Sequence, residues 1–291
     1  MNTFSGAVRT KSFVFSTELF LRPESNAETI AAQTNLLKDH VDGILLTDNQ
    51  GGRLHLSPLA AASLVMANGA DPIVQLSCRN RNRIALLGDL LGLAAIGVSS
   101  LVVTKGNRVP EGFNPRPKAV FDIDATELIT MACRMTGDEC LPHLEDLFVG
   151  CIITPHEAQP GWVPEKLAKK ADVGAQFAQT HICMDPALMA GYMKHLVAAG
   201  LPRRLSIFVS LAVLRSAEDA RWLRNNLPNN RIPDEVIQRL EQAHDAEQEG
   251  VKICAEQLQQ LAEIPGINGA HLIATRELAT IGATIALFRN P

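Results

Sequence analysis

Strand-like and helix-like segments alternate along most of the 291-residue sequence, and this regularity constrains the fold more than any other feature. Short runs rich in branched and aromatic residues are typical of buried strands, and segments with helical spacing follow most of them at intervals of about thirty residues. The strand candidates are residues 13–21, 44–46, 72–78, 99–104, 147–154, 177–183, 205–211 and 270–274. The helix candidates are residues 27–39, 57–64, 84–96, 125–135, 165–171 and 188–199, with 233–240 and 245–264 before the last strand. The series predicts an α/β fold, a (β/α)8 barrel of the TIM type, in which residues 1–291 form one domain with an extra helical connection before the last strand.

An open, doubly wound sheet is the alternative arrangement of the same elements. Such a sheet more usually has a glycine-rich turn after its first strand. Here that turn reads Arg22-Pro23-Glu24-Ser25, which favours the barrel. In both architectures the ligand lies at the carboxyl ends of the strands, so we expect the functional residues there.

Charge and cysteine content exclude several classes of function. The net charge of -4 and the pI near 6.1 argue against a surface for nucleic acids or anionic membranes, which leaves a small molecule as the expected ligand. The six cysteines form no Cys-x-x-Cys pair, so neither a metal site nor a disulfide framework is predicted. No apolar run is long enough for a signal peptide or a membrane span. A cytoplasmic protein with reduced thiols is expected.

Glu18 stands out because it lies in a run that otherwise reads as a fully buried strand, Phe-Val-Phe-Ser-Thr-Glu-Leu-Phe-Leu at 13–21. A buried carboxylate must be paired, protonated or facing a cavity. The run ends at Arg22-Pro23, so Glu18 falls near the carboxyl end of its strand. The structural alternative is a half-exposed Glu18 paired with a neighbouring lysine or arginine.

Polar side chains are predicted to surround Glu18 at the barrel mouth. They are Thr47, Gln75, residues 104–107, Thr154 with His156, His181 and Arg276. One acid that faces neutral hydrogen-bonding groups suits a proton donor, because apolar surroundings without a nearby cation favour its protonated form. Paired carboxylates for glycoside chemistry, a Gly-x-Ser-x-Gly elbow and a His-Glu-x-x-His pair are not evident in the sequence.

These residues resemble those of the 5,10-methylenetetrahydrofolate reductases, flavin-dependent barrels that move a hydride from a nicotinamide to FAD and on to the folate methylene carbon. The resemblance covers most of the chain. Its carriers are residues 15–20 with Glu18, Leu-Ser-Cys-Arg-Asn-Arg-Asn-Arg at 76–83, Val-Val-Thr-Lys-Gly-Asn at 102–107 with Pro110, Lys-Lys-Ala-Asp-Val-Gly-Ala at 169–175, Thr-His-Ile-Cys-Met-Asp at 180–185 and Arg-Ile-Pro at 231–233. It implies an oxidoreductase that binds FAD, uses NADH or NADPH as co-substrate and acts on a tetrahydrofolate derivative.

The resemblance also implies roles for individual residues. The family's general acid matches Glu18, which would protonate a folate nitrogen as the five-membered ring opens to an iminium. Cofactor-binding positions of the family match Thr47, Gln75, Lys105, Gly106, Asn107, Phe121 and Lys170. The expected cofactor-binding set also includes Thr104, Thr154 and His156 at the strand ends and Lys166 on the helix of Lys170. Substrate-binding positions match Glu18, Asn107, His181 and Arg276. Within the cofactor set, Phe121 matches an aromatic residue near the adenine and Lys170 a lysine at the flavin phosphates.

Six positions depart from the family pattern. Asn107 replaces an aspartate, Gln75 a histidine, Lys105 an arginine and His181 a glutamine, and Val213 and Ala217 replace a proline and a phenylalanine. The departures leave open a flavin-free barrel that binds a folate or another pterin as a methyl-transfer or scaffold subunit. They also leave open the direction of the reaction, because a neutral Asn107 favours oxidation of methyl groups. A homo-oligomer or a complex with a partner subunit is expected.

Some of these residues also have a purely structural interpretation. His181 fits a hydrogen-bonded core position, and the lysines at 166, 169 and 170 fit a solvated helix face. Arg79, Arg81 and Arg83 form a charged run that, taken alone, predicts a solvated loop.

Overall fold

A computed structural model describes residues 3–109, 113–135, 147–159, 161–227 and 229–290. Its strands form a closed parallel barrel in chain order, with β1 paired to both β2 and β8. The strands are β1 (Val14–Glu18), β2 (Gly43–Leu46), β3 (Pro72–Ser77), β4 (Ser100–Thr104), β5 (Phe148–Ile153), β6 (Phe177–Ile182), β7 (Ser206–Val213) and β8 (Ile267–Ala274). The predicted (β/α)8 barrel is confirmed, and the open sheet is excluded.

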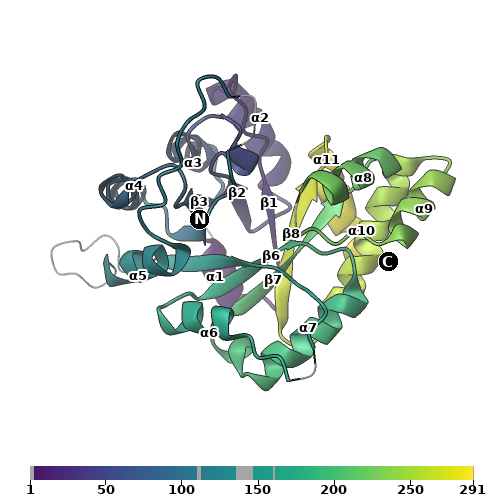
Figure 1. Cartoon of the computed structure of the whole chain (residues 1–291). Coiled ribbons are helices and arrows are strands. Elements are labelled where there is room, and N and C mark those ends of the chain that lie inside the picture. The colour runs from purple at the N-terminus through teal and green to yellow at the C-terminus, as the bar shows by residue number, and fades with distance from the viewer. Residues whose placement is uncertain (1–2, 110–112, 136–146, 160, 228, 291) are drawn as a thin grey trace.

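Helices surround this barrel, and each of the first seven strands is followed by one (Figure 1). They are α2 (Ala27–Leu37), α3 (Pro58–Ala67), α4 (Arg83–Ala95), α5 (Ala125–Met135), α6 (Glu165–Asp172), α7 (Pro186–Ala198) and α8 (Ala217–Asn226), then α9 (Asp234–Gln242) and α10 (Ala246–Ala262) before β8, and α11 (Ala279–Arg289) after it. Side chains of Asn26, Asn82 and Asp185 cap the first turns of α2, α4 and α7. Among the described residues, no helix is both long and apolar enough to cross a lipid bilayer.

The barrel interior at the amino ends of the strands is a packed apolar core, which a short N-terminal helix, α1 (Phe4–Thr10), closes. The ring of Phe4 lies 5.3 to 6.0 Å from those of Phe148, Phe177 and Phe208, which point inward from β5, β6 and β7. The backbone N–H of Phe4 donates to Asp71 Oδ2 at 2.7 Å, which fixes the start of the helix. The barrel interior is therefore filled at this end, so we expect a ligand at the opposite end.

The barrel interior at the carboxyl ends of the strands is polar. Inward-facing positions along each strand are two residues apart, so the character of the interior can be followed along a strand. On β1, Val14 belongs to the apolar layer, whereas Glu18 lines a cavity four residues further on. On β6, Phe177 is in the same apolar layer and His181 lines the same cavity. The sequence thus places apolar residues at the amino ends of the strands and polar residues at their carboxyl ends.

Three helices were not predicted from the sequence. The helix α1 was not predicted because seven residues with little periodicity give no signal, and its packing inside the barrel stabilises it instead. The predicted connection between β7 and β8 contained two helices, whereas α8 adds a third. The last helix, α11, completes the eighth strand–helix unit and packs against α10 and α2.

Candidate active site

A cavity of about 120 Å³ opens at the carboxyl ends of the strands. Seven predicted site residues line it, namely Glu18, Thr47, Gln75, Thr104, Gly106, Asn107 and His181. Asp48, Asn49, Arg79, Gln179, Ser210 and Asn230 line it as well. Its volume is below the range of about 300–1,000 Å³ typical of sites for drug-sized ligands, so it encloses one part of such a ligand while the remainder lies on the rim.

Glu18 ends β1 and faces a buried histidine on the neighbouring strand β8. Its side chain is 11% exposed, and its Oε2 lies 3.8 Å from Nε2 of His271. The other ring nitrogen, Nδ1, lies 3.0 Å from Oγ of Ser16, the residue paired with His271 across the two strands. Nε2 of His271 has no hydrogen-bond partner among the described residues. The imidazole of His271 and the carboxyl group of Glu18 thus lie next to each other inside the barrel, and Glu18 is the one that lines the cavity.

One wall of the cavity, at the ends of β2, β3 and β4, offers uncharged hydrogen-bonding groups beside the charged Asp48 and Arg79. Oε1 of Gln75 accepts from the backbone N–H of Asp48 at 3.3 Å, which leaves its amide nitrogen for a ligand. Oγ1 of Thr47 lies 3.5 Å from Nε2 of His55. Gly106 has φ +87°, a left-handed conformation that lets the loop after β4 approach the cavity closely.

A charge network lies beneath this wall. The carboxylate of Asp48 pairs with Arg81, which also pairs with Asp89. Oδ2 of Asp48 also accepts from the backbone N–H of Ser77 at 2.7 Å. Arg79 is 2% exposed and contacts the loops after β2 and β4. The interpretation of the arginine run as a solvated loop is therefore wrong for Arg79 and Arg81. The run alone could not predict this, because the carbonyls of Asn49 and Asn107 and the carboxylate of Asp48 come from other loops.

His181 and Lys170 lie on the β5–β6 side of the cavity. Burial, and to a lesser degree the charge of Lys170, lower the pKa of His181, so its imidazole is neutral at pH 7. Nζ of Lys170 donates to the carbonyl of Ile152 at 3.0 Å, and Ile152 lines the cavity. Lys170 therefore reaches from α6 to the backbone of β5, and it does not itself line the cavity.

The remaining predicted site residues lie outside the cavity wall. Nζ of Lys105 lies 5.7 Å from the ring centroid of Phe121, so the predicted flavin-loop lysine lies near the predicted adenine-side aromatic residue. Nδ1 of His156 lies 3.1 Å from the carbonyl of Thr154, and its ring packs on Trp162. Lys166 and Arg276 are exposed and are not brought to the cavity.

Several residues of the cavity wall were not predicted. Gln179 precedes His181 by two positions and so shares its face, a signal that the strand period could have supplied. His271, which lies behind the cavity wall, was not predicted either, because a single histidine in an apolar strand gives no sequence signal. Asn230 comes from the connection between α8 and α9, and its Nδ2 is buried without a hydrogen-bond partner among the described residues. Such a donor in a cavity wall suits a ligand oxygen.

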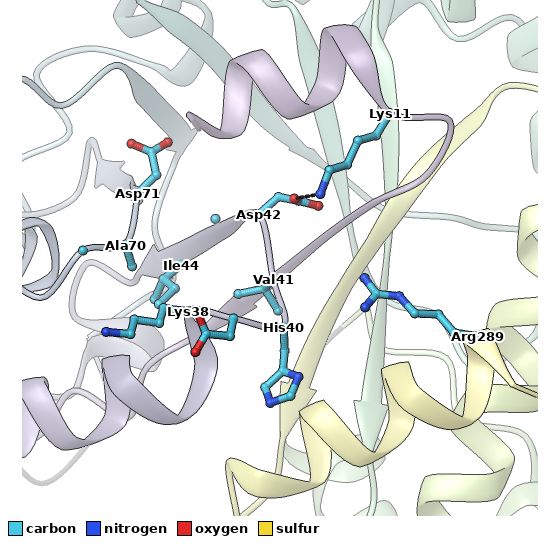
Figure 2. A pocket seen from close by; sticks show the side chains of 12 residues that line it. Lys11, Lys38, His40, Val41, Asp42, Ile44, Ala70, Asp71 and Arg289 are labelled. Carbon is cyan, nitrogen blue, oxygen red and sulfur yellow. Dashed lines mark hydrogen bonds and ion pairs between the residues drawn. The ribbon is translucent and has the colours of Figure 1, made fainter. Parts of the chain in front are cut away.

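A second cavity, of about 250 Å³, lies at the amino ends of β1, β2 and β3 (Figure 2). Four of its charged groups already have partners within the fold. Lys11 pairs with Asp42, Asp71 accepts from Phe4, and the guanidinium of Arg289 lies 5.9 Å from the ring of Phe15. This end of a barrel usually serves stability, so we place the functional site at the opposite end.

The donor set of the mouth fits the ring system of a flavin. Thr47, Gln75 and Asn107 offer neutral donors and acceptors to a planar heterocycle with carbonyl and N–H edges, and Gly106 lets the loop after β4 pack closely on Arg79 beside them. Lys105 with Phe121 provides a cation and an aromatic face on the rim for the nucleotide portion. The predicted phosphate contacts fit less well, because Lys166 is exposed and Lys170 is bound to a backbone carbonyl.

Residues 3–285 match the family model of methylenetetrahydrofolate reductase, which spans nearly the whole chain. The chain belongs to the methylenetetrahydrofolate reductase family. No match was found among curated proteins. The fold is similar to that of an uncharacterized protein from Clostridium thermocellum that binds two copies of 5-methyl-5,6,7,8-tetrahydrofolic acid, with TM-score 0.68, 12% identity, and coverage of 99% of this chain and 98% of that one. It is also similar to ligand-free tryptophan synthase from M. tuberculosis, with TM-score 0.53, 14% identity, and coverage of 98% and 95%.

Proposed function

We propose that this member of the methylenetetrahydrofolate reductase family is an FAD-dependent oxidoreductase that interconverts 5,10-methylenetetrahydrofolate and 5-methyltetrahydrofolate with NADH or NADPH. The buried carboxyl group of Glu18, at the end of β1 and open to a cavity with neutral donors, carries the proposal. Membership of the family supports it, and the folate bound by the C. thermocellum protein is consistent with it. The protein is expected to act in the cytoplasm, as a homo-oligomer or with a partner subunit.

Glu18 is the general acid of this proposal. When the carbon–nitrogen bond of the five-membered folate ring breaks, the departing nitrogen needs a proton, and the carboxyl group of Glu18 supplies it. The carbon left behind is then an iminium that accepts a hydride. His271 lies behind Glu18 and, held by Ser16, is positioned to orient it.

The ring-binding residues are those of the neutral wall. Thr47, Gln75 and Asn107 would hold the isoalloxazine, and Lys105 with Phe121 would hold the nucleotide portion. A bound flavin supplies the hydride chemistry, while the protein orients the two rings and excludes water. Neutral His181 and the amide of Asn107 offer the folate uncharged partners on two sides of the cavity.

A flavin-free barrel that binds a pterin is the second candidate. It is favoured by the hydrogen bond from Lys170 to Ile152 and by the exposure of Lys166, which leave the flavin diphosphate fewer cations than the proposal requires. This protein would bind 5-methyltetrahydrofolate as a methyl-transfer or scaffold subunit.

The visible spectrum of the purified protein tests the proposal directly. Flavin bands that NADH or NADPH bleaches and 5,10-methylenetetrahydrofolate restores are the expected result. A colourless protein that binds 5-methyltetrahydrofolate, and remains inactive after addition of FAD, would instead establish the second candidate.

A further inference from the structure

Arg79 connects three loops at the mouth of the barrel. It follows β3, and its Nε donates to Oδ1 of Asn80 at 2.8 Å. Its Nη1 donates to the carbonyl of Asn107 at 3.0 Å, and its Nη2 to the carbonyl of Asn49 at 2.8 Å. Asn49 belongs to the loop after β2 and Asn107 to the loop after β4. One guanidinium therefore holds both sides of the neutral wall.

The loop after β4 is shaped around Arg79. A Cβ on Gly106 would lie 2.8 Å from Cβ of Arg79, closer than real side chains approach, so this position requires glycine. The backbone N–H of Val120, near the far end of the same loop, donates to the carbonyl of Arg79 at 2.8 Å. Arg79 thus determines the path of the loop at both of these points.

The hydrogen bonding of this buried cation is incomplete. A guanidinium has five N–H bonds, and three are used by Asn80, Asn107 and Asn49. The other two have no acceptor among the described residues. Arg79 lines the cavity. Asp48 attracts its charge but makes its direct ion pair with Arg81. A buried charged donor without an acceptor is costly, so a ligand oxygen would complete this site.

We propose that Arg79 is a ligand-binding residue that donates these two N–H bonds to a ring carbonyl of the molecule in the mouth cavity. A pyrimidinone carbonyl suits it, because its two in-plane lone pairs accept from a planar fork of donors. That group is shared by the pterin of a folate and the isoalloxazine of a flavin. The inference rests on the proposed function and adds a contact outside the predicted site residues.

Binding titrations of Arg79→Ala and Arg79→Lys with 5-methyltetrahydrofolate and, separately, with FAD test the contact. Arg83→Ala is the matched control, because Arg83 belongs to the same run but its side chain is 56% exposed. We expect Arg79→Ala to weaken one ligand by about 10- to 100-fold, the range for hydrogen bonds from a charged donor. Guanidinium chloride at millimolar concentration should restore part of the affinity in Arg79→Ala, whereas ammonium chloride should not. The ligand that is weakened identifies the ring that Arg79 contacts.

Hydrogen exchange on the same variants measures the second, structural role of Arg79, which is to hold the loops after β2 and β4. Loss of protection in residues 47–53 and 104–109 is expected in Arg79→Ala, and Arg79→Lys should keep more of it. Unchanged affinity for both ligands in folded Arg79→Ala would overturn the proposal, as would weakened binding that guanidinium does not restore. If the unmodified protein binds neither ligand, the proposed function is wrong and the contact falls with it, a result distinct from a defect seen in the variant alone.

Discussion

Oε2 of Glu18 and Nε2 of His271 lie 3.8 Å apart on the adjacent strands β1 and β8. The distance is too long for a hydrogen bond, but it places the imidazole next to the carboxyl group. Glu18 borders the cavity and His271 lies fully buried behind it, so the pair leads from the interior of the barrel to the ligand. Within the proposed function, this arrangement assigns proton transfer to Glu18 and positioning to His271.

His271→Gln should slow the folate half-reaction by about tenfold, which is less than removal of a direct general acid costs. Because His271 does not line the cavity, KM for 5-methyltetrahydrofolate should stay unchanged while kcat falls. Ser16→Ala, which removes the hydroxyl group held to the imidazole, should change the same parameter in the same direction. Steady-state kinetics with both variants check this. A raised KM with kcat preserved would show that His271 acts on ligand binding instead.

His181 should make the stability of the protein depend on pH. Its pKa is lowered in the folded state, mainly by burial and then by Lys170, so the unfolded chain binds a proton more readily. The free energy of unfolding should therefore decrease as the pH falls through about 6.5, the ordinary value for histidine, and level off below the folded pKa. Urea unfolding of His181→Gln between pH 5 and pH 8 should show a flatter dependence. His244→Gln, at an exposed position, should keep the original slope.

Phe4→Ala should remove the ring that packs into the barrel interior at the amino ends of the strands. Phe4 is 1% exposed and contacts three inward phenylalanines, so its loss should cost about 3–5 kcal/mol of unfolding free energy. Denaturant unfolding measures this directly. Phe121→Ala, whose ring is 37% exposed, serves as the comparison and should cost far less. Equal losses in the two variants would show that the helix α1 does not stabilise the barrel.

Asn107→Asp tests whether the neutral amide affects the direction of the reaction. A carboxylate beside a flavin opposes the negative charge gained on reduction, by about 1–2 kcal/mol in a low-dielectric site. We expect the variant to have the lower reduction potential and the slower oxidation of 5-methyltetrahydrofolate. A redox titration and timed half-reactions provide both values. An unchanged or higher potential would leave Asn107 without a directional role.

The sequence predicted the barrel because each strand–helix unit carries its own local pattern. The eight strands were placed within a few residues of their bounds, and Glu18 was correctly placed at the end of β1. Seven predicted site residues line one cavity because the barrel fixes where the carboxyl ends of its strands meet. Whether they bind a cofactor or a substrate stays a prediction.

Long-range contacts explain what the sequence did not reveal. Arg79 is buried only because carbonyls from two other loops reach its guanidinium, and no local pattern encodes that. His271 meets Glu18 through the pairing of the first and last strands, which are separated by most of the chain. Lys166 and Arg276 were placed by their likeness to a family pattern, and the structure leaves both exposed.

Stopped-flow measurement of the two half-reactions in Glu18→Gln tests the central claim most directly. The change preserves size and removes the acid, so flavin content and reduction by NADH or NADPH should match the unmodified protein. Turnover of the folate should fall by two or more orders of magnitude, the contribution of a positioned acid. Glu24→Gln, whose side chain is 71% exposed, should leave both half-reactions unchanged. Equal damage to both half-reactions in Glu18→Gln, or an undiminished folate half-reaction, would contradict the assignment of Glu18 as the proton donor.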